Sequence, residues 1–89
     1  MWALTQYNLG LVLTDMAEVE DGVGALKQAV DAFNASLEVY DENDSPVDWA
    51  DAQDGLGWVL ARLGYRSKDA DMVQQGREAM QRSFDYYRD

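Results

Sequence analysis

Two stretches of the chain, WALTQYNLGLVL (residues 2–13) and WADAQDGLGWVL (residues 49–60), align without a gap at an offset of 47 residues. Seven of the twelve aligned positions are identical, among them the tryptophan, the glutamine and the glycine. The same offset continues downstream, where it pairs Phe33 with Met80. Similarity at a fixed spacing is typical of repeat architectures. We therefore predict two copies of one structural unit.

Each unit is predicted to contain two helices. Apolar side chains in the second half of the first unit are spaced alternately three and four residues apart, which places them on one face of a helix. They are Val23, Leu26, Val30, Phe33, Leu37 and Tyr40. The equivalent positions in the second unit are Ala70, Val73, Arg77, Met80, Phe84 and Tyr87. We predict an all-α fold of four antiparallel helices, near residues 2–18, 22–42, 46–64 and 68–88.

The predicted helix ends have local causes. Ser45 is a candidate N-cap, and Pro46 follows it at the first helical position, where a missing N–H costs nothing. The acidic residues 41–44 read as a polar connector between the units. Gly64 is a candidate for the residue that terminates the third helix. Beside each apolar stripe, small residues such as Ala29 and Gly76 allow two helix axes to approach closely.

Composition excludes several kinds of chemistry. The chain has 89 residues, seventeen Asp and Glu, seven Lys and Arg, and neither histidine nor cysteine. We predict one domain, 1–89, with repeat one at about 1–44 and repeat two at about 45–89. Without cysteine there is no disulfide, thiolate metal site or cysteine nucleophile. The net charge of −10 argues against binding to nucleic acid or to an anionic membrane.

The acidity is uneven. Residues 1–61 hold twelve acids against the single Lys27, a net charge of −11, whereas residues 62–89 have a net charge of +1. An acidic face for a basic partner is one interpretation. A solvated surface, tuned for high salt, is the other.

We expect neither catalysis nor a cofactor nor a metal site. Asp51 and Asp54 lie three residues apart, but acids near a helix N-terminus are ordinary surface residues that complement the macrodipole. The acidic residues 41–45 lack the glycine and the distal acid of a calcium loop, where Pro46 and Ala52 stand instead. No apolar run approaches a membrane span, and no signal peptide is recognisable, so we expect a cytoplasmic location.

The repeat resembles the tetratricopeptide family. Asn8-Leu9-Gly10 matches the core of that family's first helix, and Ala29, Phe33 and Ser36 match its second helix. The spacing of 47 residues exceeds the usual length of about 34. It is similar to the long repeats of bacterial multi-repeat proteins, whose junction motif is matched by Pro46, Trp49, Ala50, Gln53, Leu56 and Gly57.

The resemblance implies a right-handed stack of helix pairs that binds a peptide or protein on a concave face, without cofactor or catalysis. The first helix of each pair lines that face, so the expected partner-binding residues are Leu4, Tyr7, Asn8, Leu11, Asp15, Asp51, Asp54, Trp58 and Arg62. Tyr7 and Asp54 stand where a carboxylate clamp would need cations, which favours a basic or amphipathic segment as the partner. Trp2 and Trp49 are interpreted as packing residues and Trp58 as a binding residue.

An alternative function is structural. The position equivalent to Pro46 falls just before Met1, as in a segment cut from a longer array. The first helix is apolar around much of its circumference, which is unusual for a surface helix. We expect it to be covered by a second copy, as a homodimer, or by upstream repeats. The fourth helix has a polar outer face, as a terminal cap requires.

Overall fold

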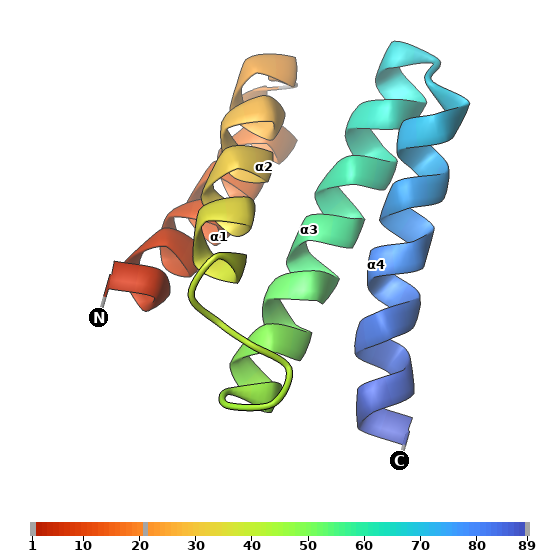
Figure 1. The fold of residues 1–89 in the computed structure, drawn as a ribbon. Helices are drawn as coiled ribbons and strands as arrows, with labels where there is room; N and C mark the ends of the chain where they lie inside the picture. The colour runs from red at the N-terminus through yellow and green to blue at the C-terminus, as the bar shows by residue number, and fades with distance from the viewer. Residues whose placement is uncertain (1, 21, 89) are drawn as a thin grey trace.

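The computed structural model describes residues 2–20 and 22–88, with the side chains of 2–16 and 22–88. Within these residues the chain forms four helices, α1 (Trp2–Glu20), α2 (Val23–Leu37), α3 (Pro46–Ser67) and α4 (Ala70–Arg88). Consecutive helices run antiparallel, and the connector over residues 38–45 crosses from the α1–α2 hairpin to the α3–α4 hairpin (Figure 1). The predicted all-α fold is confirmed.

The two hairpins are stacked in an open arrangement. α3 packs against both α2 and α4 and meets α1 only at its edge. Over the described parts of the chain, α4 contacts no helix except α3. A closed four-helix bundle would bring the fourth helix back to its partners on both sides. Here α1 and α4 lie at opposite ends of the stack (Figure 1), and within the described residues each has one side on which no helix packs.

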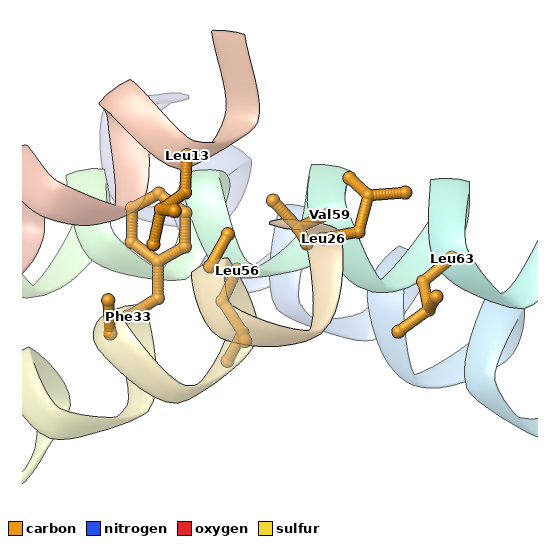
Figure 2. Close-up of a cluster of buried hydrophobic side chains, with 8 residues drawn as sticks. Leu13, Leu26, Phe33, Leu56, Val59 and Leu63 are labelled. Atoms are coloured by element: carbon orange, nitrogen blue, oxygen red, sulfur yellow. The ribbon is translucent and has the colours of Figure 1, made fainter. Parts of the chain in front are cut away.

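The ring of Phe33 joins three helices. Phe33 is fully buried, and it lies against Gly10 of α1 and Gly55 of α3. A Cβ atom at Gly10 would stand 2.8 Å from the ring, and one at Gly55 would stand 2.7 Å from it. Around it, α1, α2 and α3 contribute the buried cluster of Leu13, Leu26, Ala29, Ala32, Phe33, Leu56, Val59 and Leu63 (Figure 2).

Glycines also set the distance between α3 and α4. A Cβ at Gly57 would lie 2.6 Å from the carbonyl oxygen of Gly76, and a Cβ at Gly76 would lie 2.6 Å from the carbonyl oxygen of Gly57. A Cβ at Gly64 would lie 2.8 Å from the backbone nitrogen of Val73. The predicted close approach of helices along a small-residue stripe is therefore present in this hairpin.

Two helix ends differ from expectation by three residues or more. Gly64 does not terminate α3. The helix continues to Ser67, and Lys68 adopts the left-handed conformation at φ 57°. Gly64 instead lies where the backbone of α4 passes close to α3. α2 ends at Leu37, five residues early, since the amides of residues 38–40 bond back to carbonyls of residues 34–36 in a turn.

The start of α3 differs in detail. Ser45 precedes Pro46 as predicted, but its hydroxyl makes no cap bond to the helix. Instead it accepts a hydrogen bond from the amide of Asp41 at 3.0 Å. The hydroxyl therefore closes the connector rather than the helix.

The second apolar stripe is not buried as predicted. Phe84 is 58% exposed and Tyr87 is 55% exposed. Their equivalents in the first unit lie beside the next hairpin, whereas among the described residues no helix other than α3 packs on α4. The expected polar outer face of α4 is present nearby, where Gln74, Gln75, Glu78 and Gln81 are exposed.

Replacing Gly57 by alanine is expected to lower the free energy of unfolding by about 1–3 kcal/mol, because the new methyl group meets backbone atoms that have little room to move. Urea denaturation monitored by circular dichroism measures the change. Gly24→Ala is the control: nothing lies within 4 Å of its Cβ, so it should raise stability by about 0.4–1 kcal/mol. Equal stability of Gly57→Ala and the wild type would contradict the close approach.

Candidate functional site

Carboxylates from the N-terminal half of α3 meet tyrosines from other helices. The hydroxyl of Tyr87, near the end of α4, donates a hydrogen bond to the carboxylate of Asp51. Tyr7 of α1 packs edge-on against Phe33, with ring centroids 5.8 Å apart. It lies close enough to Asp51 and Asp54 to feel both charges. Tyr7, Asp51, Asp54 and Tyr87 are called the acid–tyrosine cluster below.

The pKa values of Tyr7 and Tyr87 are raised, in part by neighbouring carboxylates. The hydrogen bond to Asp51, followed by partial burial, raises the pKa of Tyr87 to about 12. Burial raises the pKa of Tyr7, and the charges of Asp51 and then Asp54 raise it further. A negative potential opposes formation of a phenolate and favours an incoming cation.

A pocket of about 590 Å³ opens between α3 and α4, one to two turns beyond this cluster. Trp58 and Arg62 line it from α3, with the Arg62 guanidinium carbon 5.2 Å from the centroid of the Trp58 ring. Val73, Arg77 and Met80 line it from α4. An aromatic ring with a cation above it and apolar side chains below can hold an apolar or aromatic side chain of a partner.

The structure divides the predicted partner-binding residues into groups. It brings Tyr7, Asp51 and Asp54 together in the acid–tyrosine cluster. It places Trp58 and Arg62 in the pocket between α3 and α4. The remaining predicted residues are exposed on α1, namely Leu4, Asn8, Leu11 and Asp15.

Another pocket, of about 800 Å³, lies between the connector and the ends of α3 and α4. Trp49 and Val47 line it together with Tyr86 and Tyr87. Trp49 is thus half-buried beside a cavity, and its equivalent, Trp2, is 53% exposed. The interpretation of both tryptophans as packing residues is therefore wrong for Trp2, which has no helix packed over it on its side of the described stack.

The sequence pattern does not predict the roles of two tyrosines near Asp51 and Asp48. The sequence assigns Tyr87 only to the apolar stripe of the fourth helix, and its bond to Asp51 spans 36 residues with no local pattern to reveal it. Tyr40 lies near Asp48, which after burial is the second cause of its raised pKa. The one sequence feature that relates the two tyrosines is their equivalence at the offset of 47 residues.

No helix in the described residues is long and apolar enough to cross a membrane. Over the same residues, no three acidic side chains are grouped as metal ligands would be. Comparison with protein-family models, with curated proteins and with solved structures found no significant match to this chain.

The bond between Tyr87 and Asp51 makes stability depend on pH at the alkaline end. The folded pKa of Tyr87, about 12, lies above its ordinary value of 10.0, so the stabilisation is complete below pH 10 and is lost as the pH rises toward 12. Spectrophotometric titration of the phenolates should show a step near pH 12 that belongs to Tyr87. Tyr87→Phe should remove that step and Asp51→Asn should move it to lower pH. Tyr65→Phe, at an 83% exposed tyrosine, is the control that should retain it.

Proposed function

We propose that this chain is a protein-interaction module that binds a basic or amphipathic peptide segment across α1 and α3. The observation that carries the proposal is the acid–tyrosine cluster, where the Asp51 carboxylate accepts the hydrogen bond of Tyr87 and where the charges of Asp51 and Asp54 add to burial in raising the pKa of Tyr7. The same two charges attract cations. The resemblance to tetratricopeptide repeats supports the same function and the same face.

Apolar contacts are available on both sides of the cluster. Leu4 and Leu11 of α1 are 46% and 41% exposed, and Trp58 of α3 is 38% exposed. Trp58 follows Asp54 by one helical turn, which is about 6 Å along the axis. A peptide with a lysine or arginine a few residues from an apolar side chain would fit both groups. The charges would steer association and the tryptophan would supply affinity.

Binding of basic peptides is expected to weaken about 10-fold or more in Trp58→Ala and about 3-fold in Asp54→Asn, with a shallower dependence on salt in Asp54→Asn. A peptide array identifies the ligands, and fluorescence anisotropy of labelled peptides measures the affinities. Asp71→Asn removes the same charge from an exposed site in the first turn of α4 and should leave binding unchanged. Equal binding of wild type and Trp58→Ala, or binding by neither, would contradict the proposal.

A second candidate function, self-assembly, is favoured by a separate observation. Leu9, Val12 and Met16 form a row along one side of α1, with exposed fractions of 45%, 54% and 43%. Exposure of such an apolar row to water costs free energy, and this cost is removed when another surface covers the row. We therefore propose self-association through α1 as the alternative role.

Sedimentation equilibrium is expected to show a mass that rises with concentration between roughly micromolar and millimolar. Val12→Glu should weaken the association about 10-fold or more, because it introduces a charge into the apolar row. Val39→Glu makes the same substitution at a 57% exposed valine in the connector and should have no effect. A constant monomer mass would rule this role out.

A further inference from the structure

α1 and α3 are equivalent by sequence but differ in what covers them. Leu56, Val59 and Leu63 form the side of α3 that packs on the first hairpin, and their exposed fractions are 8%, 0% and 4%. Subtracting the offset of 47 gives Leu9, Val12 and Met16, the exposed row of α1. The chain thus carries the same apolar helix side twice, once buried and once uncovered. The exposed row is called the α1 key below.

The surface that receives α3 is also present twice. In the first hairpin α3 covers Leu26, Val30 and Phe33 of α2, which belong to or border the buried cluster (Figure 2). The equivalent residues of α4 are Val73, Arg77 and Met80. These residues line the open pocket between α3 and α4. α3 of their own hairpin touches Val73 and Met80, and no further helix of the described stack packs on them. This pocket, together with the exposed Phe84 at its end, is called the α4 lock.

The surfaces also complement one another in charge. Arg62, Arg66 and Arg77 line the α4 lock. The α1 key belongs to a segment, residues 1–61, with a net charge of −11, and the exposed Asp15 lies next to Met16 of the key. If the key docks as α3 does, its C-terminal end meets the end of the lock that holds Arg62 and Arg66. Opposite charges would therefore fix both the direction and the register of docking.

From these equivalences we infer that the α4 lock of one molecule receives the α1 key of a second copy of this chain. The inference rests on the proposed self-assembly and specifies its geometry. The interface is heterologous, since the key and the lock are different surfaces of one molecule. Each added copy presents a new lock or a new key, so the assembly grows head to tail and does not stop at a dimer unless a ring closes.

Blocking each surface separately tests the geometry. Val12→Glu blocks the key, and Arg77→Glu blocks the lock by reversing a charge on an exposed residue. Phe84→Glu is a second lock variant at a 58% exposed site, so a fold defect in one does not decide the result. Gln75→Glu, exposed on another side of α4, is the control. Circular dichroism checks the fold of each variant before sedimentation equilibrium measures its mass.

The wild type and Gln75→Glu are expected to grow beyond dimers with concentration, and each blocked variant alone should associate about 10-fold or more weakly. A one-to-one mixture of Val12→Glu and Arg77→Glu should form dimers and nothing larger, because a single intact lock and key remain. If both lock variants still associate as the wild type does while Val12→Glu does not, α1 pairs with α1; the inference is then overturned and self-assembly stands. A wild type that stays monomeric overturns both.

Discussion

The packing of one aromatic ring between two glycines holds the two hairpins together. Phe33 belongs to α2, yet its ring fills space that Gly10 leaves on α1 and that Gly55 leaves on α3. A side chain at either glycine would displace the ring, and the ring could not then lie within the buried cluster. Because dispersion contacts weaken steeply with distance, the absence of a Cβ atom at both glycines lets the ring pack closely against α1 and α3. The layering of the hairpins and the position of α3 depend on it.

The second hairpin repeats this joint incompletely. Met80 stands where Phe33 would be, and it presses on Gly57 of its own hairpin. Among the described residues, no glycine of a further helix lies on its other side. A flexible thioether fills irregular space more readily than a ring does, so the α3–α4 hairpin is closed by backbone contact through Gly57 and Gly76.

Much of the architecture follows from the sequence because it is local or repeated. The spacing of Leu26, Phe33 and Leu37 predicts the apolar side of α2, and the constant offset predicts that α3 is equivalent to α1. Sequence reasoning placed Phe84 in a core stripe because it assumed that equivalent residues have equivalent neighbours. That assumption fails for α4, where the pattern persists but no described helix beyond α3 packs on it.

The candidate site was less predictable for a different reason. Asp51 and Asp54 are one turn apart and could be placed on one side of a helix from spacing alone. The tyrosine that reaches Asp51 comes from the end of α4, and its approach depends on the crossing of α3 and α4. Gly64 was misassigned for the same reason. As a glycine near a helix end it has the chemistry of a terminator, and only the path of α4 over it shows that close packing is its role.

Within the described residues α4 is attached through α3 alone, and this has a consequence for how the protein opens. A helix held on one side can separate without disturbing the cluster around Phe33, whereas separation of α3 breaks contacts on both of its sides. Separation of α4 should therefore leave the cluster around Phe33 intact, and α3 should be among the last helices to exchange its amide hydrogens. Unfolding in this chain is therefore coupled between neighbouring helices of the stack, and the four helices need not unfold together.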